Sequence, residues 1–500
     1  MRVEQLPEEL RPLMVPRPRS GLAYRCLGCG AEPGLDRLAY TCPQCGEVLL
    51  IEDLDLDSLK KIPGQTWQKV FDLRRTLNLP ALKGVFLFHE LVAPLIPLED
   101  VVYLGEGQTP LVAANKTMEA EAGRPFWFKN DGQNPSASFK DRGMASAVSY
   151  LNHLLNSGRM KKILAVCAST GDTSAAAALY GAFLKDGLST AVLLPQGKVT
   201  PQQLSQPLGA GAKVLEIPGV FDDCMKVVER MAESYPVALL NSKNAWRILG
   251  QQTYAFEIAQ SFDWDVSGLA VFLPIGNAGN VTAVMAGFIK LHELGLIKTL
   301  PRIFGVQSEH ADPVFRYFLE PREAKRRFSP VAVQDSVAQA AMIGNPVSMP
   351  RVISLSQKLK RISGHELTVV RVSEQEIMDS MLLANRHGHV VCTQGGESLA
   401  GLRAAVKEGL VGPETGAVLD STAHMLKFID FQTMYFENSF PDRFEIEPKP
   451  ELVNAPELVR PKNAPCPAPG RPLSGPELET FVEAAARLAA QKLGLEQPDS

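Results

Sequence analysis

The chain has 500 residues, more than one typical hydrophobic core accommodates, so we expect two or three structural units. Apolar residues make up 45% and charged residues 21%, ordinary proportions for a globular protein, which excludes a largely disordered chain. A net charge of −4 gives no general attraction to polyanions, and no run approaches the roughly 18 apolar residues of a membrane span, so we expect a cytoplasmic protein without membrane or nucleic-acid partners.

The first predicted domain, residues 1–50, contains two tight cysteine pairs. Two residues separate the cysteines within each pair and twelve separate the pairs, which gives four thiolates at Cys26, Cys29, Cys42 and Cys45. This spacing is typical of a zinc ribbon, and reduced cytosolic thiols favour Zn²⁺ over disulfides. Four thiolates leave no position for water, so we expect a structural ion, with a docking module as the alternative role. We expect residues 38–40 to form a strand leading into the second pair.

The next two predicted domains are a connector and a catalytic body. Residues 51–100 mix charged and apolar stretches with prolines, which indicates a helical connector. From 101 to 440, β-rich apolar runs alternate with amphipathic, Ala-rich stretches, as in βαβ units around a parallel sheet. We expect strands over 162–167, 190–194 and 269–273, and helices over 173–183 and 281–292. The predicted fold class is α/β with mostly parallel sheets.

The last predicted domain covers residues 441–500. Its first part, to about residue 475, is rich in proline and indicates an extended segment. A helix is expected after Ser474, which can cap it, because apolar residues recur at helical spacing at Leu478, Phe481, Val482, Ala485 and Leu488.

Lys140 lies between a polar loop broken by Gly and Pro and a helix that opens at Asp141 and runs to about Asn156. A lone lysine at such a junction is usually a solvated helix start, but its surroundings here are distinctive. The segment Asn134-Pro-Ser-Ala-Ser-Phe-Lys-Asp-Arg-Gly143 closely resembles the cofactor-lysine motif of the tryptophan synthase β-subunit fold group, and within it the threonine synthase family. The resemblance implies that Lys140 holds pyridoxal 5′-phosphate and shuttles protons at the substrate.

Further segments resemble the same family in the same order, over roughly residues 20–440. They are Gly105–Leu111, Ala168–Thr173, Gly276–Asn280, Ile343–Pro346 and Ser421–His424. The N-terminal ribbon also occurs among threonine synthase relatives. The resemblance therefore implies a pyridoxal-phosphate fold of two α/β lobes preceded by the small zinc ribbon.

The expected cofactor site combines physical reasoning with this resemblance. A Gly/Asn loop between a strand and a helix start offers backbone N–H groups and the positive end of the helix dipole to a phosphate, which favours Gly276, Asn277, Ala278, Gly279 and Asn280. The resemblance implies that Thr422 hydrogen-bonds the pyridine nitrogen. It also places Asp172 near the ring hydroxyl of the cofactor, where many relatives have Asn.

The expected substrate site uses two further segments. Hydroxyls at the strand-to-helix turn suit a substrate carboxylate, which points to Ser169, Thr170 and Thr173. The segment Asn241–Arg247 resembles the part of threonine synthase that binds the phosphate of O-phosphohomoserine, with hydrogen bonds from Asn241 and Ser242 and a cation from Arg247. The implied reaction converts O-phospho-L-homoserine and water to L-threonine and phosphate.

Two other classes of function stay open on the sequence. A cysteate synthase or a threonine dehydratase of the same fold group could share Lys140 and the phosphate loop while accepting another substrate. A non-catalytic protein could bind partners through the ribbon, but the intact Lys140 and loops argue against it. The sequence leaves the oligomeric state open, with a homodimer among the options.

Overall fold

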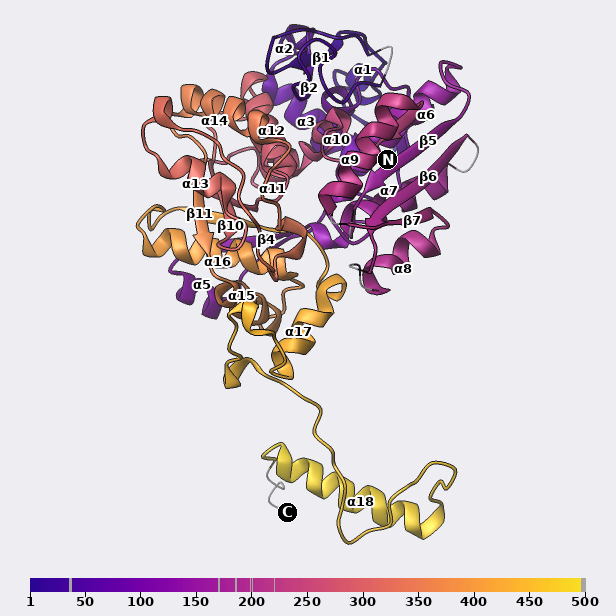
Figure 1. Ribbon diagram of the computed structural model, residues 1–500, viewed down its shortest axis with the longest axis vertical. Coiled ribbons are helices and arrows are strands. Elements are labelled where there is room, and N and C mark those ends of the chain that lie inside the picture. The colour runs from indigo at the N-terminus through magenta and orange to yellow at the C-terminus, as the bar shows by residue number, and fades with distance from the viewer. Residues whose placement is uncertain are drawn as a thin grey trace. The chain divides into compact units, whose positions relative to one another are not determined.

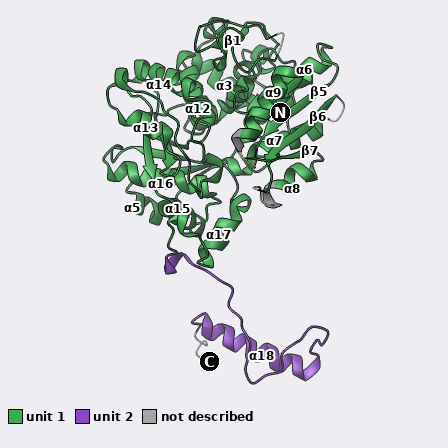
Figure 2. Cartoon of the chain, viewed as in Figure 1, with its two compact units in different colours: residues 1–447 green, residues 448–500 purple. Residues whose placement is uncertain are grey.

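The computed structural model describes residues 1–495 except 36–37, 170, 185–186, 198, 200 and 220. The chain divides into two compact units, residues 1–447 and 448–500, which Figure 2 colours separately. None of the helices searched among these described residues is long and apolar enough to cross a membrane.

The N-terminal segment is built on a two-stranded antiparallel sheet. Strand β1 (Leu22–Cys26) pairs with β2 (Leu49–Asp53), so that Cys26 lies opposite Leu49. The prediction of a strand at residues 38–40 is wrong. Strands β1 and β2 hydrogen-bond to each other, and the chain enters the second cysteine pair through an isolated bridge between Thr41 and Val48. The helices around this sheet and in the following segment are α1 (Arg11–Met14), α2 (Leu56–Lys60), α3 (Gly64–Arg74) and α4 (His89–Val92).

A six-stranded sheet forms one lobe of the body. Its order is β11-β10-β9-β12-β4-β3, with all neighbours parallel except the short edge strand β3. The buried inner strands are nearly continuous apolar runs, as expected for a sheet covered on both faces. The strands are β3 (Leu111–Ala113), β4 (Phe126–Asn130), β9 (Leu269–Pro274), β10 (Arg302–Ser308), β11 (Thr368–Val372) and β12 (Gly416–Ser421).

A four-stranded parallel sheet forms the other lobe, in the order β7-β6-β5-β8. Its strands are β5 (Ile163–Ala168), β6 (Leu188–Pro195), β7 (Lys213–Ile217) and β8 (Val237–Leu239). Figure 1 shows β5, β6 and β7 beside α6, α7, α8 and α9. The two sheets confirm the predicted α/β class with mostly parallel strands.

Helices connect the strands of both sheets and pack against them. Helix α16 contacts β9, β10, β11 and β12, whereas α7 and α9 contact β5 and β6. The helices are α5 (Lys116–Ala122), α6 (Lys140–Asn156), α7 (Asp172–Phe183), α8 (Pro201–Gly209), α9 (Phe221–Ser234), α10 (Ala245–Gln251), α11 (Thr253–Ser261), α12 (Gly279–Glu293), α13 (Pro313–Leu319), α14 (Met349–Ser363), α15 (Glu374–Arg386), α16 (Thr393–Lys407) and α17 (Ile429–Phe436).

The structure confirms the elements predicted around the site. The expected strands correspond to β5, β6 and β9, and the expected helices to α6, α7 and α12. Helix α12 begins two residues earlier than predicted, at Gly279, which puts the end of the Gly/Asn loop in the first helical turn. One hydrophobic core joins the N-terminal ribbon to both sheets, including Tyr24, Leu49, Ile163 and Val271.

The second unit contains the predicted tail helix, α18 (Gly475–Lys492). Ser474 occupies the residue before the first turn, as expected, but its side chain makes no capping hydrogen bond. The segment from Pro448 to Ser474 has one short 3₁₀ turn, η10 (Pro450–Leu452), and is otherwise irregular.

Candidate active site

A cavity of about 510 Å³ opens where the carboxyl ends of strands from both sheets meet. Segments that follow β5, β8, β9 and β12 line it, which is the usual location of ligand sites in open α/β sheets. Thr170 lies outside the described residues. The cavity collects every other predicted cofactor or substrate residue: Lys140, Ser169, Asp172, Thr173, Asn241, Ser242, Arg247, Gly276, Asn277, Ala278, Gly279, Asn280 and Thr422.

Lys140 is the first residue of α6, and backbone pairing fixes it beside Thr422. The Phe139 amide donates to the Thr422 carbonyl at 2.8 Å, and Ser138 forms an antiparallel bridge with Ala423. Burial of its amino group and then the positive charge of Arg247 lower the pKa of Lys140 from 10.5 to about 7. The lowered pKa increases the fraction of Lys140 amine that is neutral, and so nucleophilic, near neutral pH.

The loop before α12 forms a cradle suited to a phosphate. Ala278 is in the left-handed region with φ 60°, and its carbonyl accepts from the Thr282 amide at 3.2 Å. The amides of the first helical turn, which precede that bond, have no acceptor within the helix and remain available to an anion. A Cβ on Gly276 would lie 2.9 Å from the Ala341 Cα, so the close approach of these two segments requires glycine.

Asp420, on the adjacent strand β12, supports this cradle through Asn280 of α12. The Asn280 amide donates to the Asp420 carboxyl at 2.7 Å. Burial, and then the negative charge of Asp131, raise the pKa of Asp420 well above its usual value. The raised pKa favours the neutral form of this carboxyl, which adds no negative charge beside a bound phosphate.

Several buried polar atoms around the cavity have no protein partner among the described residues. They are Arg247 Nε, Gln251 Oε1, Asn280 Oδ1 and both amide atoms of Gln394. Buried polar groups are normally hydrogen-bonded, so unpaired ones in a cavity are suited to a polar ligand. Together with the reactive lysine and the phosphate cradle, they fit pyridoxal phosphate and an amino-acid substrate. Sequence reasoning missed Gln394, which no motif singled out.

An ion pair at the cavity wall was also missed. Lys427 Nζ lies 2.8 Å from the Asp172 carboxylate and donates to the Ser136 carbonyl at 2.9 Å. Asp172 is therefore held by a cation as well as placed at the start of α7. Lys427 follows the predicted Ser421–His424 segment by three residues, and its proximity to that segment was the available signal.

The segment after β8 carries Arg247 into the cavity. Arg247 is buried, and Nη1 donates to the Leu240 carbonyl at 2.9 Å. Burial lowers the pKa of Arg247 to about 10. The Asn241 amide accepts from the Ala168 N–H at 3.0 Å and donates to the Ala168 carbonyl at 2.6 Å. Asn241 thus joins the ends of β8 and β5, which brings the Arg247 and Ser169 segments to one cavity.

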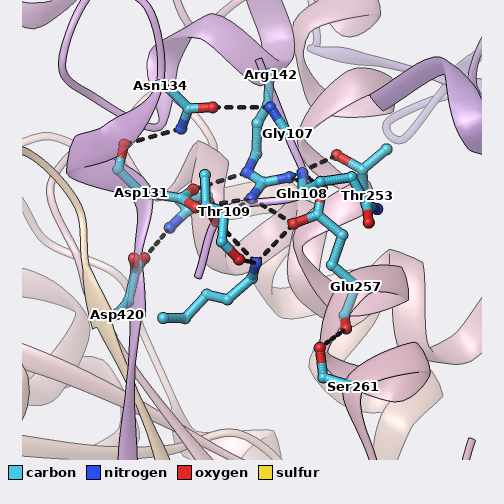
Figure 3. Close-up of polar contacts among 12 residues, drawn as sticks. Gly107, Gln108, Thr109, Asp131, Asn134, Arg142, Thr253, Glu257, Ser261 and Asp420 are labelled. Carbon is cyan, nitrogen blue, oxygen red and sulfur yellow. Dashed lines mark hydrogen bonds and ion pairs between the residues drawn. The ribbon is translucent and has the colours of Figure 1, made fainter. Parts of the chain in front are cut away.

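A buried ionic network fixes the start of α6 (Figure 3). Arg142 lies between Asp131 at 2.7 Å and Glu257 at 2.6 Å, and Lys129 contacts Glu257 at 2.6 Å. Burial favours protonation of Glu257, but Arg142 and Lys129 outweigh it and lower its pKa to about 2. The two cations and two anions balance in charge. The network therefore fixes Arg142 in the first turn of α6, the turn that also carries Lys140. No role for this network was predicted.

The four N-terminal cysteines form a separate cluster. All four sulfur atoms lie within 4.8 Å of one another, with 3.4 Å from Cys26 to Cys45 and 3.6 Å from Cys29 to Cys42. Zn–S bonds of about 2.3 Å place tetrahedral ligands about 3.8 Å apart, so the cluster could hold a zinc ion. Each first sulfur also accepts backbone N–H groups, from Gly28 and Cys29 in one pair and from Gln44 in the other.

Comparisons with known proteins agree with this geometry. Residues 102–420 match the family model described as pyridoxal-phosphate dependent enzyme. The threonine synthase of Methanocaldococcus jannaschii is 35% identical over 412 residues, covering 81% of this chain and 93% of the relative. The threonine synthase of Methanosarcina acetivorans is 36% identical over 411 residues, covering 81% and 91%.

A plant relative and a solved structure extend the similarity. Threonine synthase 2, chloroplastic, of Arabidopsis thaliana is 35% identical over 431 residues, covering 86% of this chain and 80% of the relative. The crystal structure of threonine synthase from Escherichia coli has the same fold, with a TM-score of 0.60 at 21% identity, covering 92% of this chain and 94% of that one.

Proposed function

Because the chain belongs to the threonine synthase family of pyridoxal-phosphate-dependent enzymes, we propose that it converts O-phospho-L-homoserine and water to L-threonine and phosphate. One observation carries the proposal. Lys140, the phosphate cradle before α12 and the separate cationic segment at Arg247 open into one cavity. A cofactor phosphate and a substrate phosphate each have a place there.

The proposed cofactor contacts use residues that line the cavity, with the roles that the family resemblance implies. Lys140 holds the cofactor covalently, residues 276–280 bind its phosphate, Thr422 meets the pyridine nitrogen, and Asp172 lies by the ring hydroxyl. When bound, pyridoxal phosphate would withdraw electrons from the substrate and so support proton loss at Cα and then at Cβ, which allows phosphate to depart from Cγ. A neutral Thr422 hydroxyl does not force a proton onto the pyridine nitrogen, as a carboxylate would.

The proposed substrate contacts divide between the two ends of the amino acid. Hydroxyls and amides from Ser169, before α7, and from Thr173, in its first turn, bind the carboxylate. Thr170, which lies outside the described residues, is proposed for the same role on its resemblance alone. Ser242, Asn241 and Arg247 bind the phosphate, whose charge Arg247 neutralises as it departs. The Lys140 amine, when free beside the substrate, would accept the Cα and Cβ protons in turn and return protons at Cγ and finally at Cα.

Product analysis tests this function against its alternatives. Purified protein loaded with cofactor is incubated with O-phosphohomoserine, with L-threonine and with L-serine, and the products are identified. We expect threonine and phosphate in equal amounts from the first substrate. Formation of a 2-oxo acid from threonine or serine, with O-phosphohomoserine left intact, would instead assign a dehydratase of the same fold group.

The depressed pKa of Lys140 predicts the pH dependence of cofactor loading. The neutral amine reacts with an aldehyde, and a pKa of about 7 makes that form predominant above pH 7. We expect the rate at which the apoprotein takes up pyridoxal phosphate to rise through pH 7 and then level off. The measurement is the growth of visible absorbance at a series of pH values. A rate that keeps rising towards pH 10 would mean that Lys140 has an ordinary pKa.

We also propose that the cysteine cluster holds a structural Zn²⁺ ion. Four thiolates at the observed spacing suit tetrahedral zinc and leave no position for a water nucleophile. A cytoplasmic location is proposed with it, because four reduced thiolates are needed to hold the ion and a reducing compartment keeps them so.

Replacing Cys26 and Cys29 by Ser should release the metal. The ribbon has little core of its own, so residues 1–50 should become sensitive to protease while the body retains its cofactor. Metal analysis, limited proteolysis and the visible absorbance of the bound cofactor measure the three effects. Cys466→Ser, in the other compact unit, is the control. Wild-type protein purified without chelators that contains no zinc would contradict the assignment.

A further inference from the structure

Arg351 in α14 connects the ribbon to the segment that carries the proposed phosphate ligands. It is completely buried, and its guanidinium donates to carbonyl oxygens on two sides. On the ribbon side, Nε and Nη2 donate to Leu49 of β2 at 3.0 and 2.5 Å. On the other side, Nη1 donates to Ser242 and Nη2 to Lys243, both at 2.9 Å. The rigid fork of one arginine therefore sets the spacing between β2 and the substrate segment.

Arg351 also reaches the cofactor cradle through one intermediate. Its Nη1 donates to the Ser348 hydroxyl at 3.0 Å. The Ser348 amide in turn donates to the Asn277 carbonyl at 3.2 Å. The same side chain thus relates the loop proposed for the cofactor phosphate to the loop proposed for the substrate phosphate.

Two tyrosines tie the ribbon region to the same segment independently of Arg351. The Tyr40 hydroxyl, between the two cysteine pairs, accepts from the Leu239 amide at 2.8 Å, two residues before Asn241. The Tyr150 hydroxyl of α6 donates to the Leu35 carbonyl of the ribbon. The ring of Tyr150 stacks on Trp246 with centroids 4.1 Å apart. Trp246 directly precedes Arg247.

We propose that the ribbon braces the substrate-phosphate segment, residues 239–247. Arg351 and Tyr40 are the positioning residues: they hold Ser242 and Arg247 at fixed positions relative to the ribbon. The proposal rests on the proposed function, because it assigns a purpose to the ribbon in phosphate recognition. The four cysteine ligands of the ribbon saturate the proposed zinc ion, so the metal takes no part in the chemistry. The contribution of the ribbon is to hold backbone carbonyls and an amide at fixed positions, since small displacements of substrate-binding groups weaken catalysis strongly.

The brace predicts a defect in substrate binding that leaves the cofactor unaffected. In the holoenzyme, Arg351→Met should raise the KM for O-phosphohomoserine roughly 10- to 100-fold while kcat falls less and the visible spectrum is unchanged. Tyr40→Phe removes one acceptor from a buried amide and should raise KM about fivefold. Arg351→Lys keeps the charge but loses the fork, so its KM should lie between those of wild type and Arg351→Met.

Arg326→Met is the matched control. Arg326 is also buried, but it donates to Glu366 and to the Glu320 carbonyl, and neither belongs to residues 239–247. Its loss should lower the melting temperature with KM within about twofold of wild type. If Arg351→Met does not fold, Arg351→Lys and Tyr40→Phe carry the test.

The outcomes distinguish failure of the brace from failure of the proposed function on which it rests. Failure of the wild type to consume O-phosphohomoserine overturns the proposed function. Normal turnover by the wild type, combined with an unchanged KM in folded Arg351→Lys and Tyr40→Phe, overturns the brace alone. A raised KM with unchanged zinc content and unchanged cofactor absorbance supports it, because a purely structural loss would lower the amount of active enzyme without moving KM.

Discussion

Lys140→Ala is expected to reduce turnover of O-phosphohomoserine by roughly a thousandfold or more. A methyl group can neither hold the cofactor covalently nor transfer protons at the substrate carbons. The fold should survive, because no ion pair joins the Lys140 amino group to a carboxylate of the described residues, and this group lies over the Phe139 ring, 3.9 Å from the ring centroid. Steady-state kinetics measures the loss, and circular dichroism together with the melting temperature checks the fold.

Lys69→Ala is a suitable control for this substitution. Lys69 lies on α3, outside the cavity lining, and its loss should leave kcat and KM unchanged. Normal activity in Lys140→Ala would contradict the assignment of Lys140 as the cofactor lysine. Inactivity in both variants would point to a defect in the protein preparation.

Arg247→Ala is expected to lower kcat/KM on O-phosphohomoserine by roughly a hundredfold. A charge-assisted contact to a departing phosphate in a closed site contributes about 3 kcal/mol to transition-state stabilisation. The amount of bound cofactor should not change, because Arg247 has no assigned cofactor contact. Arg247→Lys should recover only part of the loss, since a point charge cannot replace the guanidinium fork.

The comparison substrate for both Arg247 variants is an unphosphorylated analogue such as serine or homoserine. The loss should be confined to the phosphorylated substrate. An equal loss on both would indicate that Arg247 has a general structural role, for which its bond to the Leu240 carbonyl is the candidate, and would favour an enzyme whose substrate has no phosphate.

The sequence predicted the catalytic lobes well because their signals are local. Strands such as β5 and β9 are apolar runs that end in Ser/Thr- or Gly/Asn-rich loops. In parallel sheets the carboxyl ends of neighbouring strands lie at the same edge, so residues in such loops meet even when they are far apart in the chain. Residues around Ser169, Gly276 and Thr422 therefore converge as expected.

The supporting contacts could not be predicted, because they depend on packing between distant elements. Glu257 meets Arg142 only because α11 lies against the start of α6, and Arg351 reaches Leu49 across the interface between α14 and the ribbon. Neither Glu257 nor Arg351 stands in a distinctive pattern. The strand expected at residues 38–40 failed for a similar reason: Tyr40 contacts Leu239 of another element, while β1 and β2 complete the ribbon sheet.

In the proposed reaction, phosphate leaves by cleavage of the Cγ–O bond and water adds at Cβ. Turnover of O-phosphohomoserine in H₂¹⁸O tests it directly, with both products analysed by mass spectrometry. We expect one solvent oxygen in the threonine hydroxyl and none in the phosphate, because the bridging oxygen departs with the phosphate. Phosphate that carries solvent oxygen, accompanied by homoserine in place of threonine, would show hydrolysis at phosphorus and contradict the proposed function.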